Sequence, residues 1–305
     1  MKTIAIGNSE LVSSRLVYGC MRISGDHSPA DRDKGKQAIR AAIEAGYTHF
    51  DHADIYGDGA CETLFAEVLS EMPRLRDKLL ITGKCGIRLA DQPRPGDPKR
   101  YDFSRQYIID SVDGILCRLG IDSLDLFLLH RPDFLFDAEN VAGTFQILQD
   151  SGKVRHFGVS NFRPSQVSLL QKFCPMPLLT NQVEINIDNM TAFDDGTLDQ
   201  CQERSISPMA WCPLGGVAYP AWGNTLSAEQ TARVTAELER QANTYRSEPW
   251  IVILAWLLKH PAGILPIIGS TRPSRIRAAL QSLKLDYTAE DWYRLLEARN
   301  GHEVA

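Results

Sequence analysis

Four polar residues stand at or just after the ends of successive strand-like runs, and their side chains could together reduce a carbonyl group. They are Asp51 and Tyr56 near the run at 47–53, Lys84 closing the run at 78–84, and His130 closing the run at 123–130. An aldehyde or ketone that accepts a hydride must receive a proton on its oxygen at nearly the same time. A positioned phenol can donate that proton, so the pattern predicts a site with Tyr56 as the acid.

The other three residues have complementary parts in this hypothesis. The reference pKa of a tyrosine is about 10, and a neighbouring ammonium favours the phenolate, so we expect Lys84 to make Tyr56 more acidic. Asp51 would hold Lys84 charged and oriented, and His130 would hydrogen-bond the substrate oxygen. Lowering the pKa of the phenol by about three units requires roughly 4 kcal/mol of differential stabilisation, which only a partly dry site provides.

Strand-like and helix-like segments alternate along the chain. The β-rich runs lie at 15–19, 47–53, 78–84, 123–130, 153–160, 177–183, 206–211 and 263–269. Helical periodicity is found at 33–46, 104–120, 137–152 and 163–173. Three helices stop where a left-handed cap belongs, at Gly46, Gly120 and Gly152. Eight strands roughly 25–40 residues apart predict one domain over residues 1–305, a single (β/α)₈ TIM-type barrel with a short N-terminal hairpin and an extra C-terminal helix.

A doubly wound sheet is the rival architecture, but the phosphate-binding GxGxxG motif that should follow its first strand is absent. The segment after Val17 reads YGCMRISGDH. Two segments interrupt the alternation, a Pro/Gly/charge-rich stretch at 86–102 and the stretch 214–226. Each follows a strand, so we expect both at the C-terminal face of the barrel, where they would set substrate specificity. The aromatic residues that could line the pocket are Tyr101, Tyr219 and Trp222.

The composition argues against several classes of protein. The chain has 305 residues, of which 44% are hydrophobic and 23% charged, and its net charge of -5 argues against a nucleic-acid partner. The N-terminus lacks the pattern of a signal peptide, and no window approaches the roughly 18 apolar residues of a membrane span. The seven cysteines form no CxxC pair and are odd in number. They predict neither a disulfide framework nor a zinc site, and favour a soluble protein of the reducing cytoplasm.

Six motifs, in order along the chain, resemble the aldo-keto reductase superfamily, and within it a bacterial oxidoreductase subgroup. They are DHADIYG (51–57), ITGK (81–84), LLHRPD (128–133), GKVRHFGVSNF (152–162), NQVE (181–184) and PIIGS (266–270). The resemblance covers nearly the whole chain and implies a TIM-type barrel that binds NADPH in extended form without a Rossmann domain. It also implies that the four residues form a catalytic tetrad, in which Tyr56 donates the proton and His130 orients the carbonyl.

The resemblance further implies three groups of residues that bind NADPH. The residues that would hold or stack on the nicotinamide are Ser160, Asn161, Gln182 and Trp211, with Asp51 beside them. The loop over the pyrophosphate would consist of Cys212, Pro213, Leu214, Gly215 and Gly216, whose glycines would let backbone N–H groups approach phosphate. The residues near the ribose and the adenosine phosphate would be Gly19, Met21, Arg22, Gly269, Ser270, Thr271 and Arg275.

The last strand and helix have a form that suits phosphate. The segment GSTRPSRIR at 269–277 looks like a loop entering a helix, with Pro273 in the first turn. Helix N-termini bind phosphate, and β/α barrels often hold it after strands seven and eight. The resemblance implies that Arg275 contacts the adenosine 2′-phosphate. Gly269 and the alanines at 278–279 depart from the commoner lysine and Glu-Asn of the family, so the strength of the preference for NADPH over NADH stays open.

Other function classes are alternatives to an NADPH-dependent reductase that acts on CH–OH groups. A redox-sensing regulatory module with little turnover would hold NADPH through the same motifs. A metal-dependent hydrolase would use His49, Asp51, His52 and His130, but His52 would point away from the strand face that His49 and Asp51 share. A Schiff-base aldolase is disfavoured, because Asp51 would keep Lys84 protonated. We therefore expect a small-molecule carbonyl substrate, no metal, no membrane or nucleic-acid partner, and a monomer, and no residue pattern names the substrate.

Overall fold

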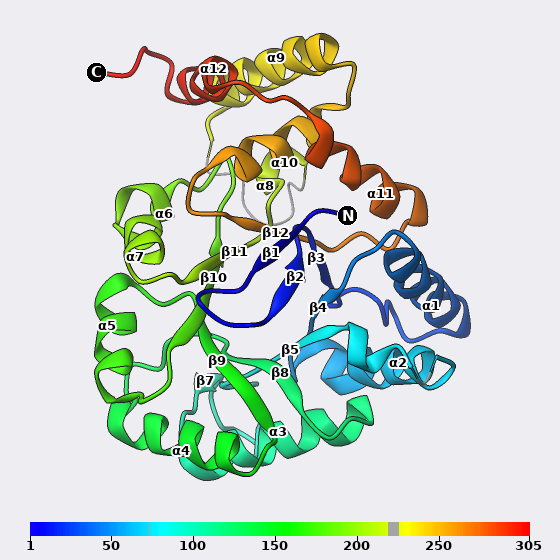
Figure 1. The fold of residues 1–305 in the computed structure, drawn as a ribbon, viewed down its shortest axis with the longest axis vertical. Coiled ribbons are helices and arrows are strands. Elements are labelled where there is room, and N and C mark those ends of the chain that lie inside the picture. Colours follow the sequence, from blue (N-terminus) through cyan, green and yellow to red (C-terminus); the bar gives the residue numbers. More distant parts are fainter. Residues whose placement is uncertain (73, 219–225) are drawn as a thin grey trace.

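Eight parallel strands close into one barrel, and helices surround it (Figure 1). The computed structural model describes residues 1–72, 74–218 and 226–305. In spatial order the barrel strands are β3 (Val17–Gly19), β4 (His49–Asp51), β5 (Leu80–Cys85), β8 (Leu124–Leu129), β9 (Val154–Ser160), β10 (Leu178–Glu184), β11 (Ser207–Trp211) and β12 (Leu265–Ile268). Pairing of β12 with β3 closes the ring. The predicted (β/α)₈ barrel is confirmed, with one barrel strand in each of the eight predicted runs.

The strands are apolar on both faces because one face fills the barrel and the other meets the helices. In β8, Leu126 and Leu128 pack with Val17 and Leu179 in the cluster that fills the barrel. Phe127, between those two leucines, packs with residues of the surrounding helices. Successive side chains of a strand point to opposite faces, so a continuous apolar run supplies both cores.

A hairpin of β1 (Thr3–Ala5) and β2 (Val12–Ser14) covers the N-terminal end of the barrel, as predicted, and lies across the near end in Figure 1. Ile6 and Leu11, between its strands, belong to the same apolar cluster as the barrel interior. Gly7 has a φ of +57°, and a Cβ there would lie 2.9 Å from the carbonyl oxygen of Ser205, so only glycine fits. The hairpin leaves the carboxyl ends of the strands for a functional site.

Helices shield the outer face of the barrel. In chain order these helices are α1 (Pro29–Glu44), α2 (Ala60–Ser70), α3 (Arg105–Leu119), α4 (Ala138–Asp150), α5 (Pro164–Phe173), α6 (Thr191–Asp194), α7 (Thr197–Glu203), α9 (Ala228–Tyr245), α10 (Pro249–Lys259), α11 (Pro273–Ala278) and α12 (Ala289–Asn300). The first begins earlier than predicted, because Ser28 caps it and Pro29 occupies its first turn. Gly46, Gly120 and Gly152 have φ of +87°, +63° and +73°, as predicted for left-handed helix ends.

The two interrupting segments each contain short regular structure. The stretch 86–102 contains a two-stranded antiparallel sheet of β6 (Ile87–Arg88) and β7 (Arg100–Tyr101), and Tyr101 is half-buried there. The stretch 214–226 begins with α8 (Gly215–Ala218). Tyr219 and Trp222, the other two aromatic residues expected to line a pocket, lie outside the described residues.

The predicted extra helix at the C-terminal end is α12, which packs against α9 and α10. Trp292 of α12 stacks on Trp256 of α10 with ring centroids 5.1 Å apart. All seven cysteines are free thiols. In the described part of the chain, no helix has both the length and the apolar character needed to cross a lipid bilayer.

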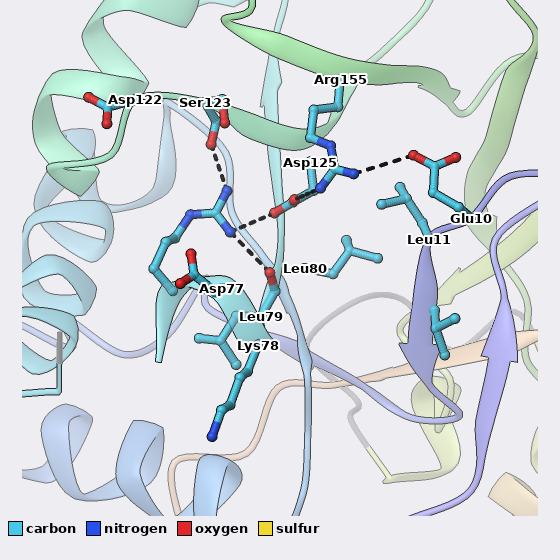
Figure 2. Close-up of a pocket in the computed structure, with 12 residues that line it drawn as sticks. Glu10, Leu11, Asp77, Lys78, Leu79, Leu80, Asp122, Ser123, Asp125 and Arg155 are labelled. Carbon is cyan, nitrogen blue, oxygen red and sulfur yellow. Dashed lines mark hydrogen bonds and ion pairs between the residues drawn. The ribbon is translucent and has the colours of Figure 1, made fainter. Parts of the chain in front are cut away.

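A polar pocket of about 440 Å³ lies at the N-terminal end of the barrel, beside the hairpin (Figure 2). Asp125 lies at the centre of its polar network: it is 4% exposed and forms ion pairs with Arg76 at 3.0 Å and Arg155 at 3.1 Å. Arg155 also pairs with Glu10, at 3.3 Å. The backbone N–H of Ile81 donates to the same aspartate. This network joins β5, β8, β9 and the segment after the hairpin turn, at the end of the barrel opposite the predicted site.

Candidate active site

The four predicted catalytic residues converge at the carboxyl ends of three neighbouring strands. Asp51 is the last residue of β4, Lys84 lies next to the end of β5, and His130 directly follows β8. Tyr56 begins the short 3₁₀ segment η1 (Tyr56–Gly59), which follows β4. Because β4, β5 and β8 are neighbours in the barrel, their terminal side chains share one end of it.

Two of these four residues, Lys84 and Asp51, form a buried ion pair. Nζ of Lys84 lies 2.6 Å from Oδ2 of Asp51, and both side chains are almost completely excluded from solvent. Nε2 of Gln182 donates to Oδ1 of Asp51 at 2.8 Å, so both carboxylate oxygens have a partner. Burial lowers the pKa of Lys84, and the charge of Asp51 opposes that shift. The carboxylate therefore holds an ammonium in a place that water does not reach.

The phenol of Tyr56 lies beside this ion pair, with Nζ of Lys84 5.1 Å from the ring centroid. Burial raises the pKa of Tyr56 well above its ordinary value, and the carboxylate of Asp51 adds to the shift. The pKa of Tyr56 in this structure is therefore shifted upward and not downward as predicted, because burial and the nearby negative charge both raise it. Tyr56 is held as a neutral phenol, which is the protonation state of a proton donor.

The imidazole of His130 packs edge-on against Tyr56, with ring centroids 5.9 Å apart and planes at 84°. Burial lowers the pKa of His130 well below its ordinary value, and the cations of Lys84 and Arg131 add to the shift. The ring is therefore neutral, with one donor and one acceptor nitrogen. Its Nδ1 is buried without a hydrogen-bond partner among the residues that the structure describes. A neutral imidazole can donate a hydrogen bond without releasing a proton.

The two other histidines near Asp51 are enclosed by the protein. His49 has Ser13 Oγ at 2.9 Å from Nδ1 and Thr82 Oγ1 at 2.7 Å from Nε2. His52 packs edge-on against Phe65 with ring centroids 4.7 Å apart. Over residues 1–72, 74–218 and 226–305, no group of three or more His, Cys, Asp or Glu residues is arranged to hold a metal ion. The hydrolase alternative finds no ligand set in these ranges.

We expect the buried His52 to destabilise the protein in acid. Burial and the charge of Lys84 lower the pKa of His52 from 6.5 to about 3. The folded state therefore excludes a proton that the unfolded chain binds, so stability is present above the unfolded pKa and is lost as the pH falls towards the folded one. His52→Leu should remove this loss. Below about pH 6, the free energy of unfolding of the wild type should decrease relative to that of the variant by roughly 1.4 kcal/mol per pH unit.

Urea unfolding of both proteins at several pH values between about 7 and 4 measures this difference. The same change at His302, which is exposed in the C-terminal tail, controls for the loss of an ordinary histidine. A difference in unfolding free energy between wild type and His52→Leu that stays constant with pH would contradict the prediction.

The predicted nicotinamide residues form one hydrogen-bonded chain over the next strands. Oγ of Ser160, at the end of β9, donates to the carbonyl oxygen of Gln182 at 2.7 Å. Nδ2 of Asn161 donates to Oγ of Ser160 at 2.9 Å and to the carbonyl oxygen of His130 at 3.1 Å. Nε1 of Trp211 donates to Oδ1 of Asn161 at 3.0 Å. The amide and the indole are therefore fixed relative to the tetrad.

The residues predicted near the ribose also lie together. A Cβ on Gly19 would lie 2.8 Å from Cγ2 of Ile267 in β12, and one on Gly269 would lie 3.7 Å from Nη1 of Arg22. The carbonyl oxygen of Ser270 accepts a hydrogen bond from the hydroxyl of Tyr18, 3.1 Å away. The neighbouring predicted residues are Met21, which is exposed, and Thr271, which is half-buried.

The predicted pyrophosphate loop is held by polar side chains that follow β10. Nδ2 of Asn186 donates to the carbonyl oxygen of Cys212 at 3.0 Å. The carboxylate of Asp188 accepts the N–H of Gly216, and the N–H of Gly215 donates to Cys212. A phosphate at this loop would have to compete for those two N–H groups. The other loop residues are Pro213, which is buried, and Leu214, which packs against the core.

The predicted adenosine-phosphate end lies at α11. Pro273 occupies its first turn, as predicted. Arg275 is exposed and has no ion-pair partner in the described part of the chain. Arg277 instead pairs with Glu44 of α1 at 2.9 Å. Arg272, at the N-cap of α11, is also exposed without an ion-pair partner in the described part of the chain, so Arg275 and Arg272 are both open to an anionic ligand.

Comparison with known proteins decides the family. The profile of the Aldo/keto reductase family matches residues 15–300. The chain belongs to the aldo/keto reductase family. The oxidoreductase YcsN of Bacillus subtilis is 40% identical over 299 residues, 97% of each chain, and the 6-dehydroglucose reductase of Agrobacterium fabrum is 39% identical over 308 residues, 100% of each chain. The crystal structure of the thermostable aldo-keto reductase Tm1743 with the inhibitor epalrestat has the same fold, with a TM-score of 0.83, 24% identity, and 98% and 100% of the two chains covered.

As an aldo/keto reductase, the protein is an oxidoreductase of a family that reduces carbonyl groups, which confirms the resemblance found in the sequence. Three polar residues around this aldo/keto reductase site were missed. The guanidinium of Arg131 lies 5.6 Å from the centroid of the Trp211 ring, Asp188 holds the loop at Gly216, and Asp54 stands between two tetrad members. Arg131 and Asp54 lie inside recognised motifs, which is a usable signal, whereas Asp188 lies in none.

Proposed function

We propose that this aldo/keto reductase uses NADPH to reduce aldehyde or ketone groups of small molecules, with Tyr56 as the proton donor. One observation carries the proposal: a buried Lys84–Asp51 ion pair of 2.6 Å lies beside a neutral phenol. The neutral imidazole of His130 packs edge-on against that phenol. A dry ion pair next to one acidic hydrogen and one hydrogen-bond donor suits protonation of a carbonyl oxygen.

Tyr56 donates the proton that the substrate oxygen receives, and Lys84, Asp51 and His130 assist this transfer. NADPH, when bound, supplies the hydride. Tyr56 meets the substrate oxygen as a neutral phenol and gives up its proton as negative charge develops there. The ammonium of Lys84 then stabilises the phenolate, and Asp51 keeps that ammonium charged despite its burial. His130 donates a hydrogen bond that sets the direction of the carbonyl.

The residues present fit a nicotinamide dinucleotide. The side-chain amide of Asn161 is fixed beside the tetrad by three hydrogen bonds, which use both of its N–H donors and leave one lone pair of Oδ1 to accept the N–H of a carboxamide. The indole of Trp211 is fixed next to it and offers a face for stacking. Gly269 lacks a side chain beside Arg22, which leaves space next to a cation. Arg275 adds an exposed cation for a terminal phosphate.

We expect Arg275→Ala to weaken binding of NADPH without weakening binding of NADH. A charge-assisted hydrogen bond contributes about 1.5–3 kcal/mol, so the Kd for NADPH should rise roughly 10- to 100-fold. Fluorescence titration of both cofactors measures the two Kd values. Arg277→Ala is the matched control, because Arg277 pairs with Glu44. An equal loss of affinity for NADPH and NADH in Arg275→Ala would contradict contact with the 2′-phosphate.

Turnover of a carbonyl panel tests the proposed function itself. Micromolar enzyme is incubated with NADPH and a set of aldehydes, ketones and quinones, and the loss of NADPH absorbance is followed together with the alcohol formed. Steady consumption with one alcohol per NADPH is the expected result. Tight NADPH binding with no turnover across the panel would instead favour a redox-sensing regulatory module.

A sugar aldehyde is the first substrate to include. The 6-dehydroglucose reductases of Agrobacterium fabrum and Novosphingobium aromaticivorans are 39% and 36% identical to this chain over 100% and 98% of its length. We propose 6-dehydroglucose as a candidate substrate on that similarity. A kcat/KM for it no higher than for simple aldehydes of the panel would argue for another substrate.

A further inference from the structure

A second carboxyl group, that of Asp54, lies between Asp51 and Tyr56 in the chain and has no part in the reaction described above. Its backbone N–H donates to the carbonyl oxygen of Lys84 at 3.0 Å, so the residue lies directly beside the end of β5. Its Oδ1 is buried and has no hydrogen-bond partner within the described ranges. A buried carboxylate oxygen without a partner is costly, and such a group calls for an explanation.

Glu62 of α2 places another buried carboxyl group next to Asp54. The side chain of Glu62 is 0% exposed, and its Oε2 accepts a hydrogen bond from Nε of Arg118 in α3. Its Oε1 is also buried without a partner among the described residues. Arg118 thus pairs with Glu62, while its charge acts on Asp54 without an ion pair between the two side chains among the described residues. Two neighbouring negative charges with a single cation favour keeping a proton on one of the carboxyls.

Burial raises the pKa of both carboxyl groups of this pair. Burial raises the pKa of Asp54 to about 7 and Glu62 adds to the shift, while the backbone of Ile55, Arg118 and Lys84 oppose it. The charge of Asp54 is also among the causes that raise the pKa of Tyr56, where it follows burial, Asp51, Cys20 and Cys61 in size. The titratable and charged groups that act on Asp54 or are affected by its charge are Lys84 and Cys85 on β5, Tyr56 on η1, Glu62 on α2, and Tyr107 and Arg118 on α3.

We propose that Asp54 is a positioning residue: its proton, held next to Glu62, sets how readily Tyr56 releases a proton to the substrate. The inference rests on the proposed function. When Asp54 is protonated, one negative charge fewer faces the phenolate that forms during reduction, so Tyr56 gives up its proton more easily. When Asp54 is ionised, its charge opposes the phenolate and slows reduction. Asp54 therefore makes reduction faster below neutral pH than above it.

The pH dependence of kcat/KM tests this, with an aldehyde for which a deuterium isotope effect shows that hydride transfer limits the rate. For the wild type, kcat/KM should fall roughly three- to tenfold as the pH rises through about 7. Asp54→Asn keeps the shape of the side chain and should abolish this step. Glu62→Gln should move the step to lower pH, because it removes the charge that raises the pKa of Asp54. Asp137→Asn, at the N-cap of α4, should keep the wild-type step.

Infrared difference spectra follow the same proton without turnover. The wild type should lose a protonated-carboxyl band at a pH near the Asp54 pKa of about 7, and Asp54→Asn should not. A wild-type step in the profile of Asp54→Asn would overturn the inference. A loss of rate in Asp54→Asn that is the same at every pH would also overturn the inference, because such a loss would mean that Asp54 has only a structural role. If the wild type loses the infrared band near pH 7 but reduces no carbonyl compound, the proposed function is contradicted. The ionisation of Asp54 would then still be established.

Discussion

Replacing Tyr56 by Phe is expected to lower kcat for carbonyl reduction by roughly 10²- to 10⁴-fold, which is the contribution of a general acid. The change removes one hydroxyl group and leaves the ring that packs edge-on against His130. The Lys84–Asp51 ion pair does not depend on that hydroxyl, because both oxygens of Asp51 are already engaged by Lys84 and Gln182. The Kd for NADPH should therefore stay close to the wild-type value.

Stopped-flow measurement of NADPH oxidation, with a separate fluorescence titration of NADPH, distinguishes the two effects. Tyr293→Phe is the matched control, because this tyrosine is 49% exposed on α12, on a helix that contributes nothing to the tetrad. Turnover of Tyr56→Phe within about tenfold of the wild type would mean that another group, or water, protonates the substrate. A parallel loss of NADPH affinity would mean that the ring supports the cofactor and not only the acid.

The sequence predicts the tetrad because the barrel places polar strand ends on one face. Asp51, Lys84 and Ser160 each close an apolar run, and a polar residue at that position of a β/α barrel faces the functional end. Strand positions follow from apolar content alone, since both faces of these strands are covered. The start of α1 was missed because a cap at Ser28 extends the helix beyond its apolar repeat.

The charge state of the acid could not be predicted from residue types. Lys84 beside Tyr56 suggests a lowered phenol pKa, but the outcome depends on burial and on the position of every carboxylate nearby. Asp188 shows a different limit. It lies 28 residues from Gly216 in the chain and reaches it only because β10 and β11 are adjacent. Contacts between loops of neighbouring strands leave no periodic pattern in the sequence.

Lys84→Met is expected to have the second large effect, on both stability and turnover. Removing one partner of a buried ion pair leaves an uncompensated charge and costs about 3–5 kcal/mol of unfolding free energy. The remaining carboxylate of Asp51 would also face the phenolate without an ammonium between them, so kcat should fall by about 10²-fold or more. Urea unfolding and steady-state assays measure the two losses, and Lys284→Met, at an exposed lysine, is the control.

The double variant Asp51→Asn with Lys84→Met separates the two effects. Neither side chain then carries a charge, and Oδ1 of the new amide can still accept the hydrogen bond from Gln182 that Asp51 accepts at 2.8 Å. Most of the lost unfolding free energy should therefore return, since a neutral pair avoids the desolvation penalty of a lone charge. Turnover should not return, because no ammonium stabilises the phenolate of Tyr56. A double variant that regains turnover together with stability would show that the ion pair only holds the barrel end in shape, and that the proton donor works without it.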